Sequence, residues 1–273
     1  MRLECSAESA AHDRRSALVI AHPGHELRVH GWLERVKPVV FVLTDGSGGS
    51  RVPRIGSTRR LIGGIGASQG PIFGTLSDRE LYEALVNVDT GFFTALADEI
   101  AASLCSLGVQ TVLADACEGY NSGHDICRAV VDAAVMIAQA TTNTSLATFE
   151  FLLVGSPDQA DPDGVRIELE DSALARKIAA ARAYPEMAQE VDAALERFGA
   201  EAFRIECLRS RPGGEWRPSD GDEQPYYETY GEQQVAAGLY SQVIRARQHL
   251  DPVVEALFRH ARTRAQCTLS PSC

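Results

Sequence analysis

Two histidines close an apolar stretch near the start of the chain, and their spacing could hold a metal ion. The run 17–21 (Ala-Leu-Val-Ile-Ala) is followed by His22 and His25, which a Pro-Gly pair separates. A continuous apolar run predicts a buried parallel strand, and the Pro-Gly pair predicts a turn after it. In an open α/β sheet, ligands bind beyond the carboxyl ends of the strands. Two imidazoles in such a turn can reach one metal ion.

A second polar cluster follows another apolar run, 109–114. The cluster, residues 118–125, contains His124. We therefore expect His22, His25 and His124 to bind one Zn²⁺ per chain, although cobalt, nickel or iron would also suit such ligands. Three imidazoles with one open position are the ligand set of catalytic zinc, which acidifies bound water and polarises a carbonyl group. With a carboxylate as base, that chemistry predicts hydrolysis of an amide or an ester.

A glycine-rich stretch, 44–50, follows the second apolar run, 38–43. It lacks the spacing and the lysine of a P-loop, so we interpret it as a rim loop of the site. The sequence leaves two roles open for Asp45 in this stretch. It could orient a metal-bound histidine, or it could be an ordinary turn aspartate.

Strand and helix patterns alternate along the chain and predict an α/β fold. The expected architecture is a mostly parallel, Rossmann-like sheet with helices on both faces. Strands are predicted over 17–21, 38–43, 109–114, 147–154, 165–169 (an edge strand) and 202–208. Helices are predicted over 27–35, 90–107, 126–140 and 171–183, with others starting near Asp78 and Pro185. The predicted organisation is a leader over 1–15, an α/β catalytic domain over 16–210, and a loop with a C-terminal helical extension over 211–273 that packs on the same domain.

Three stretches carry weaker patterns. We interpret 66–75 as a glycine-rich loop and the tyrosine-rich stretch 224–230 as a packed loop, although its tyrosines could line a pocket. The stretch 232–264 predicts one long helix or two helices interrupted at Pro252.

Composition narrows the class of protein. The chain has 273 residues, 45% hydrophobic content and a formal net charge of −11, which argues against a nucleic-acid or anionic-membrane surface. Seven cysteines without a C-x-x-C pair suggest reduced thiols, and the first residues lack the apolar core of a signal peptide, so we expect a cytoplasmic protein. Cys117 and Cys127 flank the second cluster; burial as small apolar side chains is favoured over metal ligation. A homo-oligomer is left open.

The stretch 21–26, Ala-His-Pro-Gly-His-Glu, resembles the Ala-His-Pro-Asp-Asp-Glu signature of the PIG-L / LmbE-like family of zinc-dependent N-deacetylases. Residues 44–46, Thr-Asp-Gly, resemble the family's motif after its second strand. The stretch 120–124, Tyr-Asn-Ser-Gly-His, occupies the place of the family's His-Pro-Asp-His. The stretch 174–184, with Lys177, resembles its late helix, so the resemblance covers roughly 16–190 and implies an LmbE-like fold.

The resemblance implies roles for single residues. His22 and His124 take the positions of metal ligands, and His25 takes the position of the ligand Asp. Gly24 replaces the general-base Asp, and Asn121 replaces a histidine that stabilises the oxyanion, a role that an amide can also perform. The other candidates for the base are Glu26, Asp45, Glu118 and Asp125. Glu118 is the first choice because it lies at the mouth of its strand, whereas Glu26 matches a structural family residue.

The resemblance implies a metal-dependent hydrolase, an N-deacetylase that acts on an N-acetylated sugar or glycoconjugate. Arg59, Arg60, Tyr120 and the tyrosines at 226, 227 and 230 are the candidates for contacts with such a small-molecule or glycan substrate. Two alternatives remain: a hydrolase of another acyl or ester bond, and a non-catalytic member that binds a metal or a ligand. Gly24 favours the non-catalytic alternative, and the survival of three candidate ligands favours the enzyme.

Overall fold

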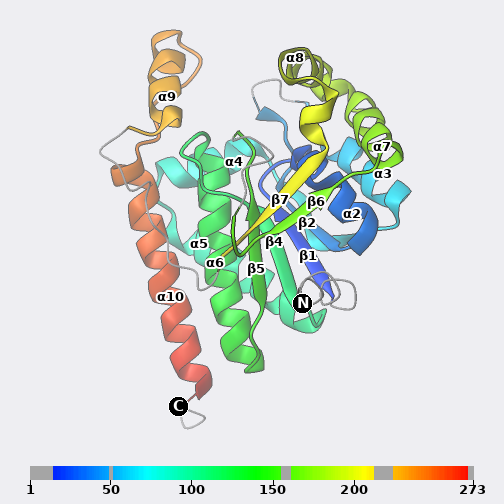
Figure 1. Cartoon of the computed structure of the whole chain (residues 1–273). Coiled ribbons are helices and arrows are strands. Elements are labelled where there is room, and N and C mark those ends of the chain that lie inside the picture. The colour runs from blue at the N-terminus through cyan, green and yellow to red at the C-terminus, as the bar shows by residue number, and fades with distance from the viewer. Residues whose placement is uncertain (1–14, 49–51, 155–160, 212–223, 270–273) are drawn as a thin grey trace. The chain divides into compact units, whose positions relative to one another are not determined.

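The computed structural model describes residues 15–48, 52–154, 161–211 and 224–269 (Figure 1). The chain divides into two compact units. The sheet unit comprises Met1–Ser77, Val109–Asp115 and Ala147–Pro212. The helical unit comprises Asp78–Gly108, Ala116–Leu146 and Gly213–Cys273. The predicted leader, 1–15, lies outside the described residues except for Arg15, and most of the expected loop 211–223 lies outside them as well.

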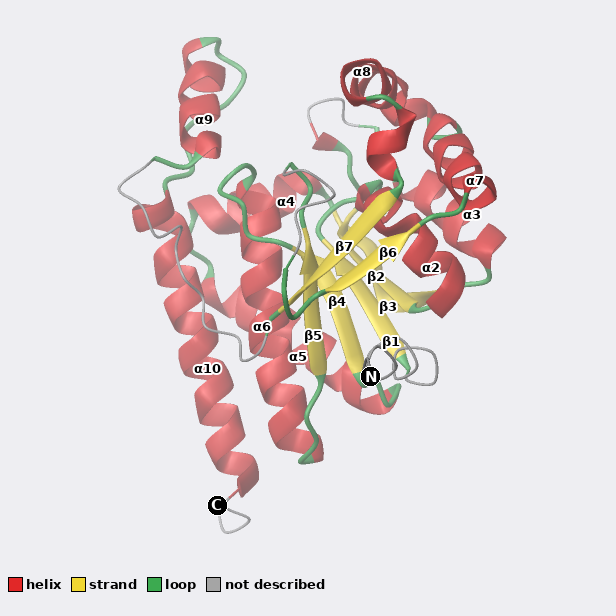
Figure 2. Ribbon diagram, in the orientation of Figure 1, coloured by secondary structure: helices red, strands yellow, loops and turns green. Residues whose placement is uncertain are grey.

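Within the described part of the chain, seven strands form one sheet in the order β3-β2-β1-β4-β5-β7-β6 (Figure 2). The strands are β1 (Ser16–Ile20), β2 (Val39–Thr44), β3 (Ser68–Leu76), β4 (Thr111–Asp115), β5 (Ala147–Phe151), β6 (Val165–Glu168) and β7 (Ile205–Ser210). The first five in the sheet order pair in parallel, while β7 runs antiparallel to both β5 and β6. The predicted α/β class with a mostly parallel sheet is confirmed, as is the edge position of β6.

The central strands explain why the polar motifs gather at one edge. β1 is fully buried, and its neighbours β2 and β4 are almost entirely buried, as expected for continuous apolar strands in a parallel sheet. The register pairs Ala17 with Val39 on one side and with Val112 on the other. The carboxyl ends of these three strands therefore meet at the same edge, which is where His22, Thr44 and Asp115 lie.

Several short helices complete the sheet unit. They are the 3₁₀ turns η1 (His25–Val29), η3 (Pro185–Met187) and η4 (Ala200–Phe203), and the helices α2 (His30–Val36), α3 (Ile55–Ile65), α7 (Asp171–Arg182) and α8 (Ala188–Phe198). Their apolar side chains pack with the strands in one core, in which Leu33 of α2, Ile62 of α3 and Leu174 of α7 accompany Leu18 and Ile20 of β1.

The helical unit contains α4 (Asp78–Val86), α5 (Thr90–Ser106), α6 (Ser122–Thr142), α9 (Tyr226–Ala236), the π turn η5 (Ala246–Leu250) and α10 (Asp251–Leu269). α6 packs against both α5 and α10, which explains why its sequence is apolar on nearly every side. None of the described helices is both long enough and apolar enough to span a membrane.

The glycines of the stretch 66–75 led us to expect a loop, and that prediction is wrong. Most of the stretch belongs to strand β3. Gly70 lies against the ring of Phe41, and a β-carbon there would approach the ring carbons at 3.0 Å. Gly74 has a φ of +65°, and the pairing with β2 shifts register along this strand. The glycines thus permit close approach and a bulge within a strand.

The tyrosine-rich stretch is also not a loop, because α9 begins at Tyr226, directly after Pro225. The break in the C-terminal helices covers 237–245 and does not fall at Pro252. Pro252 instead lies in the first turn of α10, where a missing N–H is tolerated.

A buried ion pair anchors the segment that follows His25. Glu206 of β7 accepts hydrogen bonds from the backbone N–H groups of Gly31 (2.8 Å) and Trp32 (2.9 Å). Lys177 of α7 donates to Glu206 Oε1 (2.8 Å) and to the carbonyl oxygen of Arg28 (2.9 Å). Both side chains are almost fully buried, so this pair fixes η1 and α2 against α7 and β7.

His30 gives the sheet unit a dependence on pH. Its side chain is buried, and burial lowers its pKa below the usual value, against the opposing effect of Glu34 and Glu206. Below about pH 6.5 the unfolded chain takes up a proton that the folded chain does not. We expect the free energy of unfolding to fall on acidification by up to about 1.4 kcal/mol per pH unit from this residue. Urea unfolding at pH 7.5 and 5.5 should show a smaller drop for His30→Leu; equal drops would contradict this account.

Candidate active site

Asp115 fixes the proton on one ring nitrogen of His25. It is the last residue of β4 and is fully buried. Its Oδ2 accepts a hydrogen bond from the backbone N–H of Ala21 (2.7 Å) and lies 2.9 Å from His25 Nδ1. Because an ionised carboxylate can only accept, Nδ1 carries the proton and Nε2 keeps the lone pair. The other oxygen, Oδ1, is buried without a hydrogen-bond partner among the described residues.

Thr44 fixes the ring of His22 in the same way. Its hydroxyl oxygen lies 3.1 Å from the carbonyl oxygen of Ala21 and 2.8 Å from His22 Nδ1. A carbonyl oxygen can only accept, so the hydroxyl donates to Ala21 and accepts from Nδ1. The lone pair of His22 is therefore on Nε2 as well.

The two imidazoles form a pair of nitrogen donors at the carboxyl end of β1. Their ring centroids are 5.4 Å apart and the rings are nearly perpendicular, at 89°. An imidazole whose Nδ1–H is held by a carboxylate or hydroxyl presents Nε2 to a metal ion or a proton. The donor chemistry fits a divalent metal ion. No cluster of three or more His, Cys, Asp or Glu arranged for metal binding occurs among the residues that the structure describes.

The turn between these histidines requires glycine. Gly24 has a φ of +104°, and a β-carbon there would lie 2.2 Å from Met187 Sδ. An aspartate at this position would meet backbone strain as well as the Met187 side chain. Both the backbone conformation and the Met187 side chain therefore favour glycine at this position.

Glu26 is used to hold this turn. Its Oε2 accepts from the backbone N–H of Gly24 (2.7 Å), and its Oε1 accepts from the hydroxyl of Tyr184. Tyr184 also hydrogen-bonds Thr58 (2.6 Å). Burial raises the pKa of Glu26, against the lowering effect of these hydrogen bonds.

Replacing Gly24 with alanine should destabilise the protein without touching a polar contact. The left-handed backbone costs an L-residue about 1–2 kcal/mol, and Met187 must move in addition. The midpoint of urea unfolding should shift to lower concentration, while Gly63→Ala should be tolerated because a β-carbon there meets nothing within 4 Å. Unchanged stability of Gly24→Ala would show that the turn relaxes freely.

The second polar cluster lies in the helical unit, around the start of α6. His124 is buried in the first turn. Asn121 caps the helix, with its Oδ1 accepting from the N–H of Gly123 (2.7 Å). Asp125 accepts from the backbone N–H groups of Glu118 (3.1 Å) and Gly119 (3.2 Å), so it ties the preceding loop to the helix. Burial raises the pKa of Asp125 to about 6, against these hydrogen bonds.

The remaining predicted residues have structural contacts of their own. Asp45 Oδ1 accepts from the N–H of Ser47 (2.9 Å), an interaction typical of a turn aspartate. The exposed Arg60 donates to Ser57 Oγ (2.7 Å), and the guanidinium of Arg59 lies 5.7 Å from the ring centre of Phe73. Glu118 is half-buried, and Tyr120 is exposed.

The structure thus brings His22 and His25 together in the sheet unit, while Glu118, Asn121, His124 and Asp125 are grouped in the helical unit. Sequence reasoning missed Thr44 and Asp115, the two partners of the imidazoles. The sequence did contain a feature that points to these two residues. Both are polar and end an apolar strand, and functional groups of a parallel sheet lie at such strand ends.

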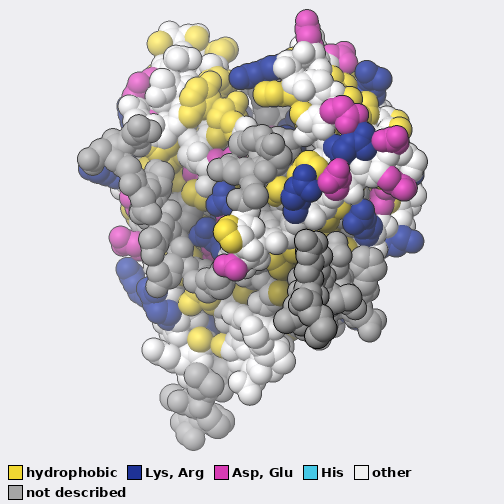
Figure 3. All heavy atoms as spheres, viewed as in Figure 1, with side chains coloured by type: hydrophobic (Ala, Val, Ile, Leu, Met, Phe, Trp, Pro, Cys, Tyr) yellow, Lys and Arg dark blue, Asp and Glu magenta, His cyan; other side chains and the backbone are white. Residues whose placement is uncertain are grey.

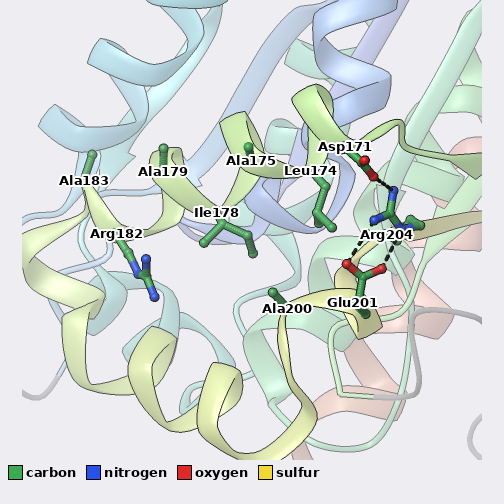
Figure 4. A pocket seen from close by; sticks show the side chains of 10 residues that line it. All are labelled: Asp171, Leu174, Ala175, Ile178, Ala179, Arg182, Ala183, Ala200, Glu201 and Arg204. Atoms are coloured by element: carbon green, nitrogen blue, oxygen red, sulfur yellow. Dashed lines mark hydrogen bonds and ion pairs between the residues drawn. The ribbon is translucent and has the colours of Figure 1, made fainter.

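A separate surface pocket of about 740 Å³ lies in the sheet unit beside α7 (Figure 4). Arg204 at its rim forms ion pairs with Asp171 (3.0 Å) and Glu201 (2.7 Å). Its floor is aliphatic and includes Leu174 and Ile178. None of the predicted site residues lines this pocket, and its lining has no nucleophile or imidazole.

Comparison with known proteins gives weak matches only. No family model matches the chain, and no curated protein matches it. Among solved structures, the conserved protein TT1542 from Thermus thermophilus is 17% identical, with a TM-score of 0.47, over 77% of this chain and 100% of that one. A triple mutant of the deacetylase Orf2 of the teicoplanin biosynthetic pathway is 12% identical, with a TM-score of 0.46, over 76% and 100%. The zinc-inhibited form of teicoplanin deacetylase Orf2 is 9% identical, with a TM-score of 0.39, over 72% and 99%. At these values the matches assign no activity to this chain.

Proposed function

We propose that this protein is a metal-dependent hydrolase that removes an acyl group from nitrogen, with an N-acetylated sugar or glycoconjugate as substrate. One observation carries the proposal: Asp115 and Thr44 hold Nδ1–H of His25 and His22, so both rings offer Nε2 at the carboxyl end of a central parallel strand. A histidine backed by a carboxylate is the usual arrangement of a catalytic metal ligand.

In this proposal His22 and His25 ligate one Zn²⁺, and His124 is the third ligand that the family resemblance implies. When bound, the ion would polarise the scissile carbonyl group and acidify a water molecule. Asp115 and Thr44 keep their histidines in the ligating tautomer. Glu118 takes the proton from the attacking water and returns it to the departing amine, and the amide of Asn121 donates a hydrogen bond to the developing oxyanion.

The sugar substrate rests on the resemblance to the PIG-L / LmbE-like family, whose motifs the stretches 21–26, 44–46 and 120–124 resemble in the same order, with substitutions. The strongest argument for the non-catalytic alternative is Gly24, since an acid there would have a strained backbone and would have to displace the end of the Met187 side chain. The alternative predicts metal binding without hydrolysis. A different bond, such as an ester or a carbamoyl group, is the remaining candidate.

Release of acetate from N-acetylated amino sugars, free and glycosidically linked, tests the proposal. An O-acetylated sugar serves as the comparison for ester cleavage. Zinc-loaded wild type should release acetate and a primary amine, and His22→Ala should lose at least 100-fold in rate. Glu118→Gln should show an equal loss in the rate of acetate release while it retains its zinc. Full activity of this variant would exclude Glu118 as the general base. No acetate from any of these substrates would favour the non-catalytic alternative.

A further inference from the structure

The surface pocket beside α7 is a trough with an aliphatic lining, and the proposed hydrolysis does not use it. Leu174 and Ile178 are four residues apart on α7, so they lie on one side of the helix in successive turns. Figure 4 shows both side chains directed toward η4, whose Ala200 also lines the trough. The remaining apolar lining consists of exposed alanines of α7, namely Ala175, Ala179 and Ala183. These side chains offer a ligand apolar contact and no hydrogen bond.

One end of the trough carries a cation. Arg182 continues the row of Leu174 and Ile178 by another four residues, and its side chain points to the same side of α7 (Figure 4). Arg182 is exposed, and it has no ion-pair partner in the part of the chain that the structure describes. Its guanidinium group is therefore available to bind an anion at this end.

The charges at the opposite end neutralise one another. Arg204 donates to both carboxylate oxygens of Glu201 (2.7 and 2.9 Å) and forms an ion pair with Asp171 (3.0 Å). It also donates to the carbonyl oxygen of Leu169 (2.7 Å). Figure 4 shows the three charged side chains together, at the end of the trough away from Arg182. Asp171 lies at the start of α7 and about 16 Å before Arg182 along the helix axis, so it does not neutralise that cation.

The charge pattern favours a ligand with a single negative charge. Figure 3 shows basic and acidic side chains intermixed on the surface over α7 and α8, with hydrophobic side chains between them. One uncompensated guanidinium group matches one carboxylate, with which it forms two parallel hydrogen bonds. A phosphate group, with about two charges at neutral pH, would meet a single cation on a chain whose net charge is −11.

The lining also restricts the body of the ligand. The ten residues that line the trough include no aromatic ring on which a flat ligand could stack. From Leu174 to Arg182 the helix rises about 12 Å. An extended alkyl chain with carbon–carbon bonds of about 1.5 Å advances about 1.25 Å per carbon, so about eight to ten carbons span this length. The volume of about 740 Å³ lies within the usual range of small-molecule sites, about 300–1,000 Å³.

We propose that the trough binds a medium-chain fatty acid, with its carboxylate on Arg182 and its alkyl chain along Ile178 and Leu174. The ligand lies in one direction only, because Arg204 at the other end is already paired. The site shares no residue with the histidine pair, so this binding function goes beyond the proposed hydrolysis and requires no metal.

Calorimetry with hexanoate, octanoate and decanoate, each below its micelle concentration, tests the site on the full-length wild type. Complete burial of a CH₂ group strengthens binding about fourfold. Because the trough is open on one side and buries the chain in part, we expect affinity to rise about fourfold for every two carbons added. Decyltrimethylammonium has the same chain length as decanoate and the opposite charge, and it should bind at least about tenfold more weakly.

Four variants separate the trough from the rest of the protein. Arg182→Gln should lose about tenfold in affinity for decanoate; a cation in the last turn also interacts favourably with the helix dipole, but that role affects stability and not binding. Ala179→Leu fills the trough with a good helix former and should lose as much. Arg176→Gln removes an exposed cation of α7 that pairs with Glu34 outside the trough, and it should bind as wild type does. His22→Ala should also bind decanoate normally.

The inference would be overturned if wild type did not bind decanoate, or if decyltrimethylammonium bound as tightly. Wild-type affinity in both Arg182→Gln and Ala179→Leu would overturn it too. A wild-type dimer that Ala179→Leu dissociates would assign the trough to a second copy of the chain instead. No arm of the test uses zinc or releases acetate, so decanoate binding by protein that holds no zinc would remove the proposed hydrolase and leave the fatty-acid site standing.

Discussion

Replacing Lys177 with methionine should lower the free energy of unfolding by about 3–5 kcal/mol. Lys177 is 5% exposed and its partner Glu206 is fully buried, so the variant leaves a carboxylate without its counter-ion in the core. Burial lowers the pKa of Lys177 while Glu206 opposes that shift, as expected for a desolvated pair. Urea unfolding at neutral pH measures the effect.

The matched control for this variant is Arg176→Met, one residue earlier on α7. Arg176 forms a bidentate pair with Glu34, but it is 54% exposed, so its loss should cost less than about 1 kcal/mol. The double variant Lys177→Met/Glu206→Gln should be less destabilised than the sum of its single changes, because the two residues interact directly. A loss below about 1 kcal/mol for Lys177→Met would show that Glu206 is satisfied by its backbone donors alone.

Replacing Asp115 with asparagine should reduce zinc affinity and hydrolytic rate by about 10–100-fold. Oδ2 alone faces both the N–H of Ala21 and His25 Nδ1, so an asparagine with its oxygen at that place keeps both hydrogen bonds and loses only the negative charge. Without that charge the imidazole of His25 is a less basic ligand. The change is small in volume, so the fold should be retained.

Two readouts separate this role from simple destabilisation. Nitrogen NMR of the imidazole of His25 should report protonated Nδ1 both in wild type and in Asp115→Asn, because the oxygen shared with Ala21 remains an acceptor. The control Asp45→Asn alters a carboxylate that accepts from Ser47 within a turn, and it should keep its zinc. Unchanged zinc affinity in Asp115→Asn would remove Asp115 from the site.

The strands that carry the candidate site residues were predictable because a buried parallel strand requires a continuous run of apolar residues. β1, β2 and β4 are fully or almost fully buried and therefore appear as continuous apolar runs. β3 has no continuous apolar run. It contains Gly70, which lies against the ring of Phe41, and Gly74, which has a left-handed backbone conformation. α9 has no clear apolar stripe because one face carries the exposed tyrosines, so the sequence suggested a loop.

The proximity of the candidate residues was predictable only where they are neighbours in sequence. His22 and His25 share one turn, and their rings lie 5.4 Å apart. Asp115 lies 90 residues beyond His25, and the register between β1 and β4 brings the two together. Thr44 meets His22 through the pairing of β1 with β2. Spacing along the chain contains no information on such pairings, although polar residues that end buried strands are the natural candidates.

The most direct test of the account is the metal content of untagged, purified protein by elemental analysis. Wild type should contain about one zinc per chain, and His25→Ala should contain none. His260→Ala removes an imidazole of α10 that pairs with Asp98, and it should keep the wild-type content. No zinc in wild type even after zinc is added back, or full zinc in His25→Ala, would contradict the proposed metal site and with it the proposed hydrolase.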